Sequence, residues 1–128
     1  MKPVDQQILG EMGDCFTASL ATLLDLPYEE VPYFISMGTA WHEPFFEFLD
    51  KHGYKYKGLA TAKRIQEGIS LGVDGYFLVS GGSPRGFKSG HSVIYKGTVL
   101  FHDPHPSRMG VLGEPMFWMI ERSDICTN

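Results

Sequence analysis

The stretch GDCFTASLATLL, from Gly13 to Leu24, decides how the fold of this chain is interpreted. Its large apolar residues recur at i, i+4, i+7 and i+8, the spacing that puts side chains on one face of a helix. We therefore expect a helix that begins at Cys15, ends near Asp25 and faces a core. Asp14 is expected to be its N-cap, because a short acceptor side chain can bond a free N–H of the first turn. The apolar residues of the face are Phe16, Leu20, Leu23 and Leu24.

The first residue of this helix is a cysteine. A side chain at that position lies near the positive end of the helix dipole, which favours a thiolate over a thiol. Because the thiolate is the nucleophilic form, Cys15 is a candidate catalytic residue. The alternative is a cysteine that packs in the core as a small apolar side chain.

The composition is that of a folded domain. The chain has 128 residues, of which 43% are hydrophobic, and a net charge of −4. We expect one domain over residues 1–128. With 15 glycines and 8 prolines, many turns and a loop-rich α+β domain are expected. The charges are mixed and no basic run occurs, so nucleic acid is not an expected partner.

The sequence gives no sign of secretion or membrane insertion. Residues 1–7 lack the apolar core of a signal peptide, and no segment has the length of a membrane span. Two cysteines, Cys15 and Cys126, do not make a disulfide framework. A reducing, cytoplasmic setting is the simplest inference. The oligomeric state is left open.

Apolar periodicity and turn residues predict the remaining elements. Helices come first and an antiparallel sheet follows, which is the α+β pattern. The strand over residues 75–80 is apolar throughout and is expected to be buried on both faces. The predicted elements are a helical turn at 29–32, a helix marked by Trp41, Phe45, Phe48 and Leu49 that ends before Gly53, strands at 54–57, 75–80, 91–95, 98–102 and 117–121, and a short helix at 61–67.

A nucleophilic cysteine needs a base, and the base needs an acceptor that orients it. His91 opens a strand directly after a glycine-rich loop, and Asp103 closes the next strand. If Lys96 and Gly97 form a two-residue turn, His91 faces His102 and Asp103 points to the opposite side of the sheet. A pairing of His91 with Asp103 therefore predicts a β-bulge or a longer turn in this hairpin.

These three residues resemble the catalytic residues of papain-like cysteine peptidases in order and spacing. The closest resemblance is to the minimal bacterial branch that includes the bacteriocin-leader (double-glycine) peptidases. Several further segments, at residues 26–32, 83–86 and 102–106, also resemble small proteins of phages and bacteria. The likeness extends from about Gln6 to Ser107. It implies a papain-like α+β fold, with a nucleophile helix packed on a small antiparallel sheet.

The resemblance also implies roles for single residues. Cys15 corresponds to the nucleophile, His91 to the general base and Asp103 to the orienting acid. The oxyanion-hole glutamine corresponds to Gln6 or Gln7. The implied activity is a cysteine-dependent peptidase or amide hydrolase without a cofactor, acting on a peptide, a protein or a small amide. Related peptidases often have glycine after the nucleophile, where this chain has Phe16, so a double-glycine leader is not the favoured substrate.

Two further residues are candidates for substrate binding. Arg85 can pair with a carboxylate or phosphate of a substrate, and Trp41 is the second candidate. The loop over residues 81–86 lacks the Gly-Lys-Ser/Thr of a phosphate-binding loop.

Other functions stay open. His91, His102, Asp103, His105 and Cys126 are metal-ligand types, but their spacing matches no standard zinc site, so no metal is expected. A deamidase or transglutaminase would use the same triad. A peptide-binding module without catalysis is a third alternative.

Overall fold

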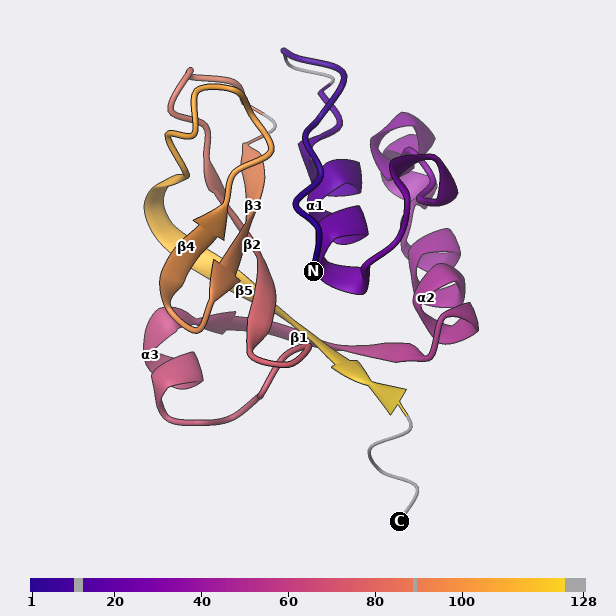
Figure 1. Ribbon diagram of the computed structural model, residues 1–128, viewed down its shortest axis with the longest axis vertical. Helices are drawn as coiled ribbons and strands as arrows, with labels where there is room; N and C mark the ends of the chain where they lie inside the picture. The colour runs from indigo at the N-terminus through magenta and orange to yellow at the C-terminus, as the bar shows by residue number, and fades with distance from the viewer. Residues whose placement is uncertain (11–12, 89, 124–128) are drawn as a thin grey trace.

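The chain forms an antiparallel sheet with helices packed against it, as the computed structural model of residues 1–10, 13–88 and 90–123 shows (Figure 1). The sheet has five strands in the order β1-β5-β2-β3-β4. The predicted α+β class is confirmed. The elements are α1 (Cys15–Leu24), η1 (Tyr28–Glu30), η2 (Phe34–Ala40), α2 (His42–Lys51), β1 (Tyr54–Thr61), α3 (Ala62–Gln66), β2 (Tyr76–Gly82), β3 (His91–Lys96), β4 (Val99–His102) and β5 (Leu112–Arg122).

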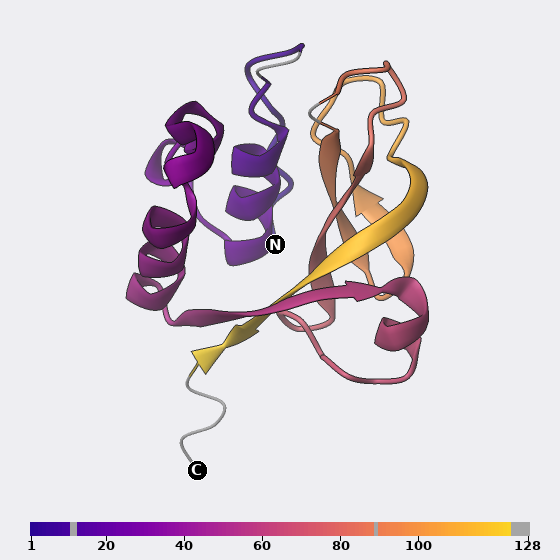
Figure 2. The same cartoon turned by 180° about the vertical axis from the view of Figure 1, so that it is seen from behind.

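Two apolar cores lie on the two faces of the sheet. Successive side chains of a strand point to opposite faces, so β2 contributes to both cores. Leu78 packs in the core that contains α1 and α2, whereas Phe77 and Val79 pack in the core that contains Ile65 of α3. Figure 2 shows α1 and α2 on one side of the sheet and α3 at its far end. The predicted burial of this strand on both faces is confirmed.

The helix α1 begins at Cys15, as predicted, and every residue from Thr17 to Leu24 is buried. The helix is therefore buried on more than its apolar face. It packs against β2 and β3 and also against the 3-10 helices η1 and η2. Its buried hydroxyls have partners within the protein. Ser19 donates to the carbonyl of Ser92 in β3 at 3.1 Å, which attaches the helix to the strand that carries His91.

The β3–β4 hairpin has the irregularity that a His91–Asp103 pairing requires, although its turn differs from the prediction. The turn residues are Gly97 and Thr98 rather than Lys96 and Gly97, so β4 begins at Val99. A register shift follows, because one strand has an extra residue, Phe101. The pairs are Lys96 with Val99, Tyr95 with Leu100, and Ile94 with His102. The predicted bulge is confirmed.

The sequence underestimates two strands and misses one helical segment. β1 extends to Thr61 rather than residue 57, and β5 begins at Leu112 rather than residue 117. Pro115 lies in β5 where its pairing with β2 is irregular, and there a missing N–H is tolerated. The unpredicted segment is η2, which is interrupted at Gly38 with φ of +58°. Over the three described ranges, no helix combines the length and the apolar character needed to cross a membrane.

Candidate active site

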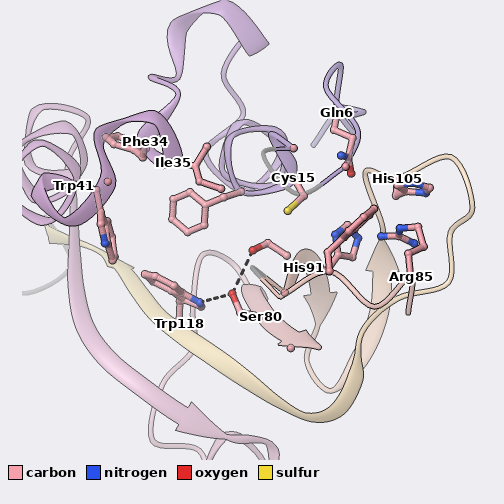
Figure 3. A pocket seen from close by; sticks show the side chains of 18 residues that line it. Gln6, Cys15, Phe34, Ile35, Trp41, Ser80, Arg85, His91, His105 and Trp118 are labelled. Carbon is pink, nitrogen blue, oxygen red and sulfur yellow. Dashed lines mark hydrogen bonds between the residues drawn. The ribbon is translucent and has the colours of Figure 1, made fainter. Parts of the chain in front are cut away.

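Cys15 lies at the start of α1 as a free, half-buried cysteine that lines a pocket (Figure 3). His91 lines the same pocket. The backbone N–H of Cys15 belongs to the first turn, where N–H groups have no partner within the helix. The nucleophile candidate therefore has beside it a backbone donor that the helix itself does not use.

Asp14 occupies the N-cap position, as predicted, but its side chain makes no capping hydrogen bond, which corrects the bond expected from the sequence. Its buried carboxylate accepts hydrogen bonds from the backbone N–H groups of Gln7 at 3.0 Å and Ile8 at 2.9 Å, and from the hydroxyl of Tyr28. Burial and the Asp14 bond raise the pKa of Tyr28 to about 12. The carboxylate thus holds the N-terminal segment against the start of α1.

His91 and Asp103 form a buried pair. His91 Nε2 lies 2.6 Å from Asp103 Oδ1, and the two residues are only 4% and 2% exposed. Asp103 also accepts from the backbone N–H groups of His105 at 2.9 Å and Gly110 at 2.7 Å. These bonds hold the carboxylate in place. Because Nε2 of His91 bonds Asp103, Nδ1 is the ring nitrogen that can exchange a proton with the Cys15 thiol.

Each member of the His91–Asp103 pair stabilises the charged form of the other. Burial lowers the pKa of His91, but hydrogen bonds to Asp103 and Cys15 and their negative charges outweigh it and raise this pKa to about 9. Burial alone would raise the pKa of Asp103. The bonds from His91, His105 and Gly110 outweigh burial and hold that pKa below its usual value. At neutral pH the pair is therefore an imidazolium and a carboxylate.

The two candidate glutamines, Gln6 and Gln7, have different environments in the structure. Gln6 is half-buried and lines the pocket, whereas Gln7 is exposed and bonds Asp14 through its backbone N–H. The Gln6 side-chain amide donates to the carbonyl of Ile8 at 2.8 Å, and its buried oxygen has no hydrogen-bond partner in the described part of the chain. Of the two, Gln6 therefore lies at the pocket that Cys15 also lines.

The N-terminal segment is attached to the loop that carries Asp103. The backbone N–H of Gln6 donates to the carbonyl of Pro104 at 3.1 Å. Arg108 pairs with both carboxylate oxygens of Asp5, at 2.7 and 3.0 Å, and also donates to the backbone carbonyl of Asp103. Gln6 and Asp103 therefore lie on connected segments.

The pocket beside Cys15 has a volume of about 420 Å³ and two chemically different sides. Trp41 and Arg85, the predicted substrate-binding residues, both line it, on opposite sides (Figure 3). Sequence reasoning missed Trp118 and Ser80, whose side chains are joined by a hydrogen bond of 3.0 Å from the indole N–H. The sequence did contain a signal for Trp118. It follows Phe117 in a predicted strand, and because neighbouring strand residues face opposite sides of the sheet, Trp118 is expected on the side opposite to Phe117.

Two other histidines, His102 and His105, have local partners. His102 Nε2 lies 3.2 Å from the carbonyl of Val4 and 3.1 Å from Asp5, and His105 Nδ1 lies 2.9 Å from the Ser107 hydroxyl. Within the described part of the chain, His, Cys, Asp and Glu form no group of three that could hold a metal ion. Cys126, named above as a ligand type, lies outside the described residues.

Comparison of the chain with family models, with curated proteins and with solved structures finds no match in any of the three.

Proposed function

We propose that this protein is a cysteine-dependent amide hydrolase or peptidase that works through a Cys15–His91–Asp103 triad on a papain-like scaffold. The observation that carries the proposal is His91, which is bonded to buried Asp103 through Nε2 and whose pKa is raised by Cys15 as well as by Asp103. A nucleophile beside a base that is itself bonded to an orienting acid is the arrangement that activates a thiol.

The raised pKa of His91 favours one of two ways to activate Cys15. A neutral imidazole that takes the thiol proton during attack would need a pKa near or below the working pH. With a pKa of about 9, His91 is already protonated at pH 7, and an imidazolium beside the sulfur favours attack by the thiolate of an ion pair. Asp103 stabilises the imidazolium and orients the ring.

The reaction then follows from the neighbouring donors. The thiolate attacks a carbonyl carbon, and the backbone N–H of Cys15 and the side-chain amide of Gln6 stabilise the oxyanion; one such donor contributes about 3 kcal/mol. His91 gives its proton to the leaving amine, and a thioester remains on Cys15. Water attacks the thioester, releases the acid and restores the ion pair.

The test is alkylation of Cys15 by iodoacetamide at about pH 6, measured by peptide mass spectrometry with Cys126 as a second thiol in the same chain. An ordinary thiol has a pKa of about 8.5 and reacts slowly at this pH. We expect Cys15 to react at least about tenfold faster than Cys126, and His91→Ala to remove this difference. If Cys15 reacts as slowly in the parent as in His91→Ala, there is no ion pair and the proposal fails.

Product analysis separates hydrolysis from the reactions that share the triad. Ammonia release without chain cleavage indicates a deamidase, and incorporation of an added amine indicates a transglutaminase. Binding of a peptide with no reaction, together with an unreactive Cys15, indicates a binding module.

A further inference from the structure

We propose that the substrate has an anionic leaving-group side, recognised by Arg85 together with His105, and an apolar acyl side that contacts the aromatic wall of Phe16, Trp41 and Trp118. This inference rests on the proposed function, because leaving group and acyl group are defined by attack of Cys15. It names the substrate as an amide whose amine portion carries a carboxylate.

The charge of the pocket is the first observation. The chain carries a net charge of −4, yet none of the described residues that line the pocket is an aspartate or glutamate. Arg85, His91 and His105 all line it. Protonated His91 is already paired with Asp103, so Arg85 is the cation that remains for a ligand.

Arg85 is held for binding but lacks a full set of partners. One terminal nitrogen donates to the Ser107 hydroxyl at 3.0 Å, while its buried Nε has no hydrogen-bond partner. No carboxylate lies within ion-pair distance of Arg85 in the described part of the chain. The terminal N–H groups of the guanidinium are therefore the ones that can bind a carboxylate or phosphate oxygen.

His105 adds a neutral donor at the same place. Its Nδ1 accepts the backbone N–H of Ser107 at 3.0 Å, so Nε2 carries the ring proton. Burial and the charge of Arg85 lower the pKa of His105, which keeps this ring neutral. Ser107 therefore joins Arg85 and His105 into one cluster of donors.

The position of this cluster assigns it to the leaving group. The rings of His105 and His91 are 6.2 Å apart, so the cluster adjoins the group that must give a proton to the leaving amine. In Figure 3, Arg85 and His105 lie beyond His91, on the side away from Trp41, Trp118 and Ile35. An anionic group held here is attached to the amine portion of the substrate.

The opposite side is built for an apolar group. Phe16 contacts Trp41 and Trp118 with ring centroids 6.2 and 5.2 Å apart, and the two tryptophans are 6.0 Å apart. The indole N–H of Trp118 is already bonded to Ser80, so this ring presents its apolar surface. Both sides of the pocket thus have a defined preference.

The test uses pairs of alkylating reagents that differ only in charge. N-iodoacetylglycine is compared with N-iodoacetylglycinamide, and N-iodoacetyl-aspartic acid α-amide with N-iodoacetyl-asparagine amide. Each rate at Cys15 is divided by the rate of the same reagent with free N-acetylcysteine. The first pair reports a terminal carboxylate and the second a side-chain carboxylate.

We expect the anionic member of at least one pair to react about tenfold faster than its neutral twin, which corresponds to about 1.4 kcal/mol. Arg85→Gln should bring this ratio to within about twofold of one, and Arg85→Lys, which keeps the charge, should retain part of it. Arg64→Gln, which removes a charge from α3, is the matched control and should keep the parental ratio. The pair with the larger effect identifies the carboxylate.

A ratio near one in both pairs overturns the inference, as does a raised ratio that survives Arg85→Gln. Neither result bears on the proposed function, which is judged separately by whether His91→Ala slows alkylation by the neutral reagents. If that substitution has no effect, the proposed function itself fails.

Discussion

Replacing Asp103 with asparagine tests the central pair of the site with almost no change of shape. The carboxylate accepts three hydrogen bonds, from His91 and His105 at one oxygen and from Gly110 at the other. Asparagine has only one oxygen, so either Gly110 or both His91 and His105 must face an N–H₂ group. In the first case a buried N–H loses its partner; in the second the His105 N–H loses its partner and the His91 imidazole is driven to the wrong tautomer.

The magnitude follows from the charges and the burial. A rise of the His91 pKa from 6.5 to about 9 corresponds to about 3 kcal/mol in favour of the protonated ring, shared between Asp103 and Cys15. An unpaired buried donor costs a further 1–3 kcal/mol, roughly. We expect Asp103→Asn to lower the free energy of unfolding by about 3 kcal/mol at pH 6 and to move the pKa of His91 toward 6.5.

The pH dependence has a definite sign. The pKa of His91 is higher in the folded state than its ordinary value of 6.5, so its contribution is complete below pH 6.5 and is lost as the pH rises through about 9. The difference in unfolding free energy between parent and Asp103→Asn should therefore be larger at pH 6 than at pH 9.5.

Urea unfolding at the two pH values and NMR titration of His91 measure these effects. The matched control is Asp74→Asn, which removes a surface carboxylate whose ion-pair partner is Arg122; the two side chains are 70% and 40% exposed. This control should change stability by less than about 0.5 kcal/mol. A loss below about 1 kcal/mol for Asp103→Asn at pH 6, with an unchanged His91 pKa, would refute the reasoning.

Two further substitutions test the packing behind the site. Gly13→Ala would put a Cβ atom 2.9 Å from the Ile8 carbonyl and 3.2 Å from Gln6 Nε2, so we expect a loss of roughly 1–3 kcal/mol and slower alkylation of Cys15; an unchanged thermal midpoint would contradict the close approach. Phe45→Ala should lower the free energy of unfolding, measured in urea, by about 3–5 kcal/mol because Phe45 is fully buried. Phe46→Ala, at a neighbour that is 43% exposed, should lower it by less than about 1 kcal/mol; similar losses at both positions would contradict the burial.

The local elements of this fold could be predicted because their signals lie within a few residues. The spacing of Phe16, Leu20 and Leu24 predicts a helix that begins at Cys15, and the structure has that helix. The ends of β1 and β5 could not be predicted in the same way. Their outer residues are held by pairing with distant strands, as Ala60 is with Phe117, rather than by an alternating pattern of their own.

The positions of single side chains required more than local patterns. Asp14 has the chemistry of a helix cap, but its carboxylate bonds Gln7 and Ile8, since the N-terminal segment folds back over the helix start. The same return of the chain separates Gln6 from Gln7. The sequence alone offers both glutamines because they are adjacent and identical.

The sequence by itself determined the α+β class, the helix with Cys15 at its start and the need for a bulge if His91 is to meet Asp103. Only the tertiary structure decided that Phe101 is the extra residue, that Gln6 is the glutamine in the pocket and that Arg85 and Trp41 line its two sides. The physical reason is that periodicity acts between near neighbours. Meetings between residues far apart in sequence depend on strand order and register, and a shift of one residue turns every side chain of a strand to the other face.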